Sequence, residues 1–211
     1  MHELHYYPGN ASLFPHMLLR ELDCPFELRL VDRDHDAQKG AAYLALNPNG
    51  KIPVLVSGGQ AIYETNAIGL FLADAHPEAG LAPLPGSAER GEYYKWMAHI
   101  SNVLQAEFRA WFYPHEFVVD EAQQGQVKDA VGARLTAAFE RLSDQLGDRP
   151  WLLESGISAA DLYLLMMIRW GRTLPRPARE IGVLGAHAER VLARPAAIRT
   201  FEAEGLSAPF V

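Results

Sequence analysis

The 211-residue chain contains a single cysteine, Cys24, which excludes an internal disulfide and a C-x-x-C redox pair. It has no run of the roughly 18 apolar residues that a membrane-spanning helix needs, and no cationic start of the signal-peptide kind. Its eight histidines are scattered, with no H-E-x-x-H motif and no Cys/His cluster. We therefore expect a cytoplasmic protein with no membrane segment and no bound metal.

The chain also lacks an excess of positive charge. It has 19 Lys and Arg against 26 Asp and Glu, a net charge of -7. Because nucleic-acid binders usually carry a basic face, this balance argues against a nucleic-acid partner. The contents of 49% apolar and 21% charged residues are ordinary for a globular protein. The length is enough to bury a full core in one or two domains.

Hydrophobic periodicity divides the chain in two. Residues 1–80 predict the element order β-α-β-α-β-β-α, which is typical of a thioredoxin-like domain. Residues 81–87 are rich in Pro and Gly and predict a linker. Residues 88–211 lack strand patterns and predict helices at 88–112, 127–146, 159–172, 183–192 and 195–204. The expected fold is an α/β thioredoxin-like domain followed by an all-α C-terminal helical bundle.

One segment of the first half predicts a peptide site. Pro53 precedes an apolar strand, and an X-Pro bond tolerates the cis isomer in such tight turns. A cis turn would leave the backbone N–H and C=O of Ile52 free to pair with an extended peptide. Glu64 and Thr65 open the next helix, where free N–H groups and a hydroxyl suit a carboxylate. Together these features predict a site for a small acidic peptide.

Three segments resemble signatures of the glutathione transferase family. They are Asn47-Pro48-x-Gly50-Lys51-Ile52-Pro53, Glu64-Thr65-x-Ala67-Ile68 and Ser158-x-x-Asp161. The resemblance, which covers most of the chain, implies a glutathione transferase fold with a cis Pro53. It also implies that Ile52 pairs with the cysteinyl backbone of glutathione and that Glu64 and Thr65 receive its γ-glutamyl end. Lys39 and Lys51 are the candidate partners of its glycine carboxylate.

The N-terminal segment is similar to the pattern Y-x-P-G-x-C-S-L-x-P-H of the bacterial beta class. It reads Tyr6-Tyr7-Pro8-Gly9-Asn10-Ala11-Ser12-Leu13-x-Pro15-His16. Ala11 stands where the class has its cysteine, so a mixed disulfide with glutathione is excluded. The candidate donors to the glutathione sulfur are Ser12 first, as in theta-like classes, and then Tyr6, Tyr7 and Asn10. The alternative for Ser12 is a plain helix cap.

The activity implied by this resemblance requires only that the pKa of the glutathione thiol be lowered. A free thiol has a pKa near 8.5, so only about 3% of it is thiolate at pH 7. One or two donated hydrogen bonds and a helix N-terminus lower such a pKa by roughly one to two units. This activation requires no acid, base or metal, which agrees with a chain that shows no catalytic cluster.

An aromatic run in the second half is a candidate wall for the co-substrate. Phe108, Trp111 and Phe112 fall at the end of the first long helical pattern. The resemblance implies an apolar co-substrate site on the first long helices of this domain. Helix-end packing or a dimer surface are the alternatives.

The function expected from the sequence is that of a homodimeric glutathione transferase acting in detoxification. It would direct the thiolate of glutathione at a small electrophilic, apolar substrate. Glutathione-dependent isomerisation, ether cleavage and peroxide reduction stay open on the same motifs. A second alternative is a non-catalytic binding or regulatory module of the same fold, for which the missing cysteine is the main argument. A thiol reductase is disfavoured because Cys24 follows the helix instead of opening it.

Overall fold

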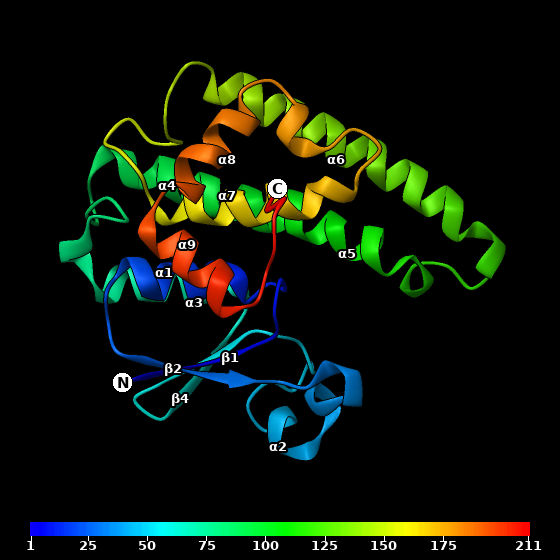
Figure 1. Ribbon diagram of the computed structural model, residues 1–211, viewed down its shortest axis with the longest axis horizontal. Helices are drawn as coiled ribbons and strands as arrows, with labels where there is room; N and C mark the ends of the chain where they lie inside the picture. Colours follow the sequence, from blue (N-terminus) through cyan, green and yellow to red (C-terminus); the bar gives the residue numbers. More distant parts are fainter. The chain divides into compact units, whose positions relative to one another are not determined.

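The computed structural model describes all 211 residues and divides them into two compact units (Figure 1). Unit 1 comprises residues 1–84 and 192–210, and unit 2 comprises residues 85–191 and 211. Unit 1 contains β1 (His2–Tyr6), α1 (Leu13–Glu21), β2 (Phe26–Leu30), α2 (Ala41–Leu44), β3 (Val54–Ser57), β4 (Gln60–Tyr63), α3 (Thr65–Ala75) and α9 (Pro195–Ala203). Unit 2 contains α4 (Ala88–His99), α5 (Ala106–Phe112), α6 (Gln124–Leu146) and α7 (Ala159–Trp170), and α8 (Leu184–Leu192) ends at its boundary.

Unit 1 is built on a four-stranded mixed sheet with the strand order β2-β1-β3-β4. β1 runs parallel to β2 and antiparallel to β3, and β3 and β4 form a hairpin. The hairpin turn consists of Gly58 and Gly59, whose φ angles are +57° and +82°. A two-residue hairpin turn with positive φ at both positions is a conformation that glycine adopts without strain. The predicted element order and the thioredoxin-like class are confirmed.

The centre of the sheet is buried on both faces. Val54 and Leu55 are neighbours in β3 and point to opposite faces, yet both have no exposed surface. Val54 packs in a small cluster with Tyr43 of α2 and Val31. Leu55 lies opposite Leu4 of β1, on the face that α1 and α3 cover. Figure 1 shows α1 and α3 on one side of the strands and α2 on the other.

The last helix, α9, packs along α1 in unit 1. We predicted from the sequence that all residues after 87 form the helical domain. The structure groups residues 192–210 with the sheet. Arg194 forms a two-pronged ion pair with Glu21 of α1, at 2.7 and 2.8 Å. The apolar face of α9 also buries Phe201 fully. Periodicity identifies such an amphipathic helix, but it cannot say which surface covers the apolar face.

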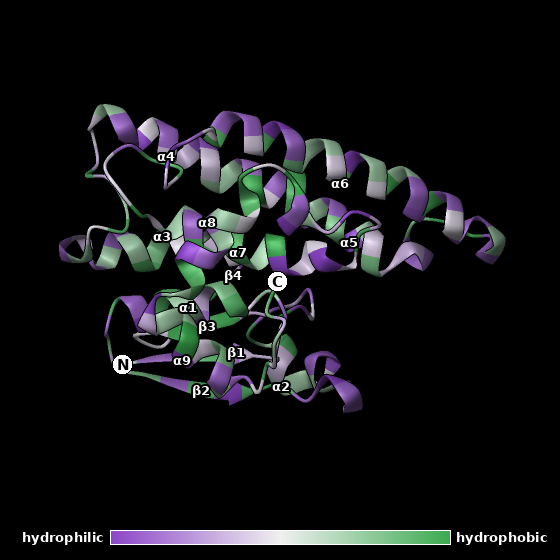
Figure 2. Cartoon of the chain, turned by 45° about the horizontal axis from the view of Figure 1, so that its top comes forward, coloured by the Kyte–Doolittle hydropathy of each residue, from purple (hydrophilic) through white to green (hydrophobic).

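Unit 2 consists of helices. The predicted helix 88–112 is present, but the structure resolves it into α4, a π-helical segment Ile100–Gln105, and α5. α6 ends at Gly147, which has φ +55°. Figure 2 shows hydrophilic and hydrophobic residues alternating along α6, as expected for a helix with one buried face. None of the helices combines the length and the hydropathy that a membrane span requires.

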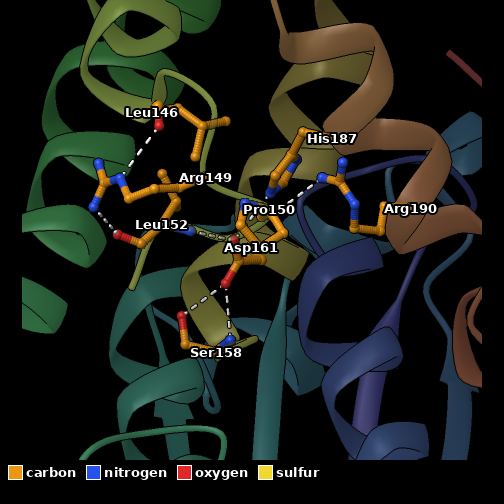
Figure 3. A network of polar contacts seen from close by, with 8 residues as sticks. All are labelled: Leu146, Arg149, Pro150, Leu152, Ser158, Asp161, His187 and Arg190. Atoms are coloured by element: carbon orange, nitrogen blue, oxygen red, sulfur yellow. Dashed lines mark hydrogen bonds and ion pairs between the residues drawn. The ribbon is translucent and has the colours of Figure 1, made fainter. Parts of the chain in front are cut away.

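The central helix α7 is anchored by a buried carboxylate at its start (Figure 3). Asp161 accepts hydrogen bonds from the backbone and hydroxyl of Ser158, at 2.8 and 3.0 Å. It also accepts from the backbone N–H of Leu152 and from Nε2 of His187, both at 2.9 Å. The capping box predicted from Ser158 and Asp161 is confirmed. The same carboxylate therefore connects α7 to α8 and to the loop that precedes α7.

Candidate active site

The sheet register brings the candidate peptide site together at one end of the sheet. His5 of β1 lies opposite Val54 of β3, and Val54 lies opposite Tyr63 of β4. The next residues outward are therefore Tyr6, Pro53 and Glu64, from three segments far apart in sequence. Loops at the end of a sheet carry groups that the ladder does not use, so this end can present donors and acceptors to a ligand.

The turn before β3 is held in shape by side chains. The Ile52–Pro53 peptide bond is cis, and Pro53 is buried. Asn47, which is also buried, donates to the carbonyl of Lys51 at 2.7 Å, and the hydroxyl of Tyr43 donates to the same oxygen at 2.9 Å. No hydrogen bond within the chain uses the N–H or C=O of Ile52. Ile52 thus keeps one backbone donor and one backbone acceptor for an external partner.

The start of α3 lies next to this turn in the register. Thr65 is the first residue of the helix and is buried, whereas Glu64 is exposed. The backbone of Glu64 has φ +74° and ψ 116°, a region that residues other than glycine rarely occupy. Such strain costs on the order of 1–3 kcal/mol and is concentrated at ligand sites. The start of α3 also provides helix N–H groups that have no partner within the helix.

The two candidate lysines come from neighbouring loops. Gly50, which precedes Lys51, lies close to Gln38, which precedes Lys39. A Cβ atom added to Gly50 would be 3.1 Å from the backbone oxygen of Gln38. Both lysines, Lys39 and Lys51, are exposed. The ammonium of Lys39 already pairs with Asp36 at 3.0 Å. Two exposed cations at the rim of the turn can attract a carboxylate, at the modest strength typical of exposed charges.

The hydroxyl of Ser12 forms both of its hydrogen bonds with the backbone of its own loop. Its hydroxyl donates to the carbonyl of Tyr7 at 3.1 Å and accepts from the N–H of Tyr7 at 3.2 Å. The side chain is fully buried and makes no capping bond to α1. Ser12 therefore closes the loop between β1 and α1, and its single hydroxyl hydrogen already has an acceptor.

Asn10 presents donors that no other group in the chain uses. Its side-chain oxygen accepts from the N–H of Ala11 at 2.6 Å, and its backbone carbonyl accepts from Leu13 at 2.9 Å. Because these bonds fix the carboxamide oxygen, the two N–H donors of the amide point away from it. Asn10 is half-buried at the head of α1.

The two tyrosines at the end of β1 differ in their surroundings. The hydroxyl of Tyr7 donates to Asp34 at 3.2 Å, and this hydrogen bond raises the pKa of the phenol. The hydroxyl of Tyr6 has no hydrogen-bond partner in the chain, and burial together with the Glu204 carboxylate raises its pKa. The Tyr6 phenol consequently keeps its proton at neutral pH and can donate it to an acceptor.

A buried hydrogen-bond network at the end of α9 supports this loop, and no sequence motif predicted it. Glu204 accepts from the N–H of Gly9 at 2.8 Å through one oxygen and pairs with Nδ1 of His16 at 2.8 Å through the other. Nε2 of His16 accepts from Arg20 at 3.0 Å, so Nδ1 carries the ring proton and donates it to Glu204. His16 stood in the N-terminal motif, but Glu204 is 188 residues further along, so only the fold relates them.

The aromatic run of unit 2 is largely internal. Phe108 is fully buried and packs against Phe112, Phe139 and Trp170, with ring centroids 5.6 to 6.1 Å apart. The indole of Trp111 donates to Thr173 at 2.9 Å. Phe112 keeps 39% of its surface exposed. Of the three candidate wall residues, Phe112 thus offers a ring to solvent, while Phe108 serves the core.

The site supplies hydrogen-bond donors but no nucleophile of its own. Cys24 lies between α1 and β2, away from the loop of residues 7–12, and burial raises the pKa of its thiol. A site of this kind can bind and polarise a ligand that brings its own reactive atom. The fold and the site define the class of two-part proteins that pair a thioredoxin-like unit with a helical unit.

Comparison with known proteins places the chain within this class. The family profile of the glutathione S-transferase N-terminal domain matches residues 12–75, and that of the C-terminal domain matches residues 108–195. A glutathione S-transferase of Xanthomonas campestris is 30% identical over 97% of this chain and its own full length. The chain belongs to the glutathione S-transferase family.

Solved structures agree with this assignment. The glutathione S-transferase of Xylella fastidiosa superposes with a TM-score of 0.89 at 30% identity, covering 98% of this chain and all of that one. A sphingomonad glutathione S-transferase in complex with glutathione has a TM-score of 0.84 at 30% identity, covering 97% of this chain and all of its own. The resemblance inferred from the motifs is therefore confirmed.

Proposed function

We propose that the protein is a glutathione transferase that binds reduced glutathione in unit 1 and directs its thiolate at an electrophilic, apolar substrate. The observation that carries the proposal is the convergence of Ile52, Thr65 and the loop of residues 7–12 at one end of the sheet. The similar sphingomonad enzyme, which was solved with glutathione, supports the same ligand.

Each part of the tripeptide has a counterpart in this arrangement. The unused backbone N–H and C=O of Ile52 pair with the cysteinyl residue in the manner of a short ladder. The start of α3, with Thr65 and Glu64, takes the charged γ-glutamyl end. Lys39 and Lys51 face the glycine carboxylate from the rim. The site thus fixes the cysteinyl sulfur near the loop between β1 and α1.

The groups on that loop decide how the thiol is activated. We assign the donation to the sulfur first to the Asn10 amide and the Tyr6 hydroxyl, because both have free donors, and then to Tyr7. The hydroxyl of Tyr7 donates to Asp34 in an exposed hydrogen bond, whereas that of the fully buried Ser12 donates to the carbonyl of Tyr7, so Ser12 comes last. The glutathione thiol releases its proton to solvent, and its electron pair forms the bond to the electrophilic carbon as the leaving group departs. Donors alone can lower the thiol pKa by about one unit.

The remaining assignments concern the cellular location, the oligomeric state and the co-substrate. We assign the protein to the cytoplasm as a homodimer with a role in detoxification. An apolar co-substrate would contact Phe112, with Trp111 nearby and Phe108 behind them. Isomerisation, ether cleavage and peroxide reduction by glutathione use the same activated thiol and are alternatives within this proposal.

Calorimetric titration with reduced glutathione tests the proposal directly. We expect saturable binding at or below millimolar concentration and, for bound glutathione, a thiolate absorbance that persists below the ordinary thiol pKa. Turnover with a panel of aryl halides, epoxides and peroxides then identifies the reaction. The absence of binding would favour a non-catalytic module of this fold, for which Ala11 in place of cysteine is the supporting observation.

A further inference from the structure

A cluster of metal-ligating side chains lies in unit 1 apart from the proposed glutathione site. Ligand atoms of His2, Cys24 and His76 all lie within 4.8 Å of one another. The three side chains are half-buried, and the rings of His2 and His76 meet edge to face with centroids 6.0 Å apart. Sequence spacing predicted no metal because these residues are 22 and 52 positions apart and form no local motif.

The fold holds each of the three residues in place. The N–H of His2 bonds to the carbonyl of Pro25 at 3.3 Å, and His2 lies opposite Phe26 in the parallel pairing of β1 and β2. This pairing sets His2 beside Cys24, whose thiol otherwise makes only a long contact of 3.8 Å with the carbonyl of Leu19. His76 ends α3. The cluster therefore joins the start of β1, the turn after α1 and the end of α3.

Two features of the cluster are those of a metal site. Nδ1 of His2 is buried and has no hydrogen-bond partner, which is costly for a polar atom and is relieved if the atom binds a ligand. Nδ1 of His76 pairs with the Glu78 carboxylate at 3.3 Å. Ligating histidines commonly direct their second nitrogen to a carboxylate in this way, which would leave Nε2 of His76 for the metal.

We propose that His2, Cys24 and His76 form a binding site for a thiophilic transition-metal ion. The expected ion is Zn²⁺, with water as its fourth ligand. One thiolate and two imidazoles are a donor set that zinc binds in tetrahedral geometry. Ligand atoms around such an ion stand roughly 3.3–3.6 Å apart, given metal–ligand distances of about 2.0–2.3 Å. Small rotations of the three side chains from the present separations close the site.

Binding changes only protonation and coordination, with no redox step. The Zn²⁺ ion forms one bond to the Cys24 sulfur and one to each imidazole, and the thiol proton passes to solvent. The metal pins the first residues of β1 to the ends of α1 and α3. Its expected role is to stabilise unit 1, because a ligand that binds only the folded state raises the free energy of unfolding.

The test uses the full chain, stripped of metal and carrying a C-terminal tag without histidines. Zn²⁺ is titrated by calorimetry, and Co²⁺ is titrated by absorbance as a spectroscopic probe. We expect one ion per chain, a higher unfolding temperature with Zn²⁺, and for Co²⁺ a thiolate charge-transfer band with the intense visible bands of four-coordination. The metal should also slow the reaction of Cys24 with a thiol reagent.

Variants assign the ligands. Cys24→Ser, His2→Gln and His76→Gln should each weaken Zn²⁺ binding at least 100-fold, and Cys24→Ser should abolish the charge-transfer band. Glu78→Gln should weaken binding about tenfold, through the orientation of His76. His115→Gln, which removes an exposed histidine of unit 2, is the matched control and should bind as the parent does.

Two results would overturn the proposal. One is the lack of saturable Zn²⁺ or Co²⁺ binding by the folded parent protein. The other is binding that is equally strong in the Cys24→Ser and His76→Gln variants. Circular dichroism and glutathione titration of each variant show whether it folds. Because the cluster is separate from the glutathione site, glutathione binding by the variants is expected to be unchanged.

Discussion

The Glu204→Gln substitution tests whether α9 holds the loop of residues 7–12 in place. Glu204 accepts one bond from the Gly9 N–H and one from the His16 ring, both at 2.8 Å. Its side chain has no exposed surface, so neither bond is weakened by solvent. Glutamine matches the shape of glutamate, but it replaces one acceptor oxygen by an NH₂ group. The new NH₂ group then faces either the N–H of Gly9 or the Nδ1–H of His16, so two donors meet without an acceptor.

The size of the effect follows from these contacts. A hydrogen bond to a charged group contributes roughly 1.5–3 kcal/mol, and an unmatched buried donor adds a penalty of similar size. We expect the free energy of unfolding to fall by about 2–4 kcal/mol. Because Gly9 precedes Asn10, the loop also shifts, and misplacement by about 1 Å costs up to 100-fold in rate. We expect kcat/KM toward the electrophile to fall 10- to 100-fold.

Urea denaturation and steady-state kinetics with saturating glutathione measure the two effects. The matched control is Glu202→Gln, which removes the same charge from the exposed side of α9 and should change neither quantity. If Glu204→Gln lowers stability but leaves kcat/KM at the parent value, Glu204 only fastens α9 to α1. If Glu204→Gln and Glu202→Gln unfold with the same free energy, the buried hydrogen bonds of Glu204 do not stabilise the fold and the reasoning is refuted.

Three further predictions concern single side chains. Thr65→Val keeps the volume but loses the hydroxyl, and should weaken glutathione binding by about 1–3 kcal/mol, or roughly 5- to 150-fold by calorimetry; unchanged affinity would remove Thr65 from the γ-glutamyl site. Asn10→Ala should raise the pH midpoint of the thiolate absorbance of bound glutathione, whereas a larger rise in Ser12→Ala would return the role to Ser12. Asp161→Ala leaves the donors of Leu152, Ser158 and His187 unpaired, and urea unfolding should show a loss of at least about 3 kcal/mol.

Local patterns in the sequence were sufficient for the elements and for the ligand class. The change from β-α patterns to purely helical ones after residue 87 reflects side-chain periodicities of 2 and 3.6, which a chain shows without its fold. Ile52-Pro53, Glu64-Thr65 and Ser158-x-x-Asp161 are short motifs of neighbouring residues, and the capping bonds between Ser158 and Asp161 span only three residues. Such motifs can be read from sequence because their geometry is local.

Contacts between distant segments establish which side chains have donors available for a ligand. Ser12, the first candidate from sequence, gives its hydroxyl hydrogen to Tyr7, while the Asn10 amide keeps its donors. Glu204 reaches Gly9 from the far end of the chain, and His2, Cys24 and His76 meet across three elements. These outcomes depend on sheet register and on helix packing between distant segments. The element order and the kind of ligand could be predicted from local patterns. Which donors, supporting residues and proposed metal ligands lie together depends on packing between residues far apart in the sequence.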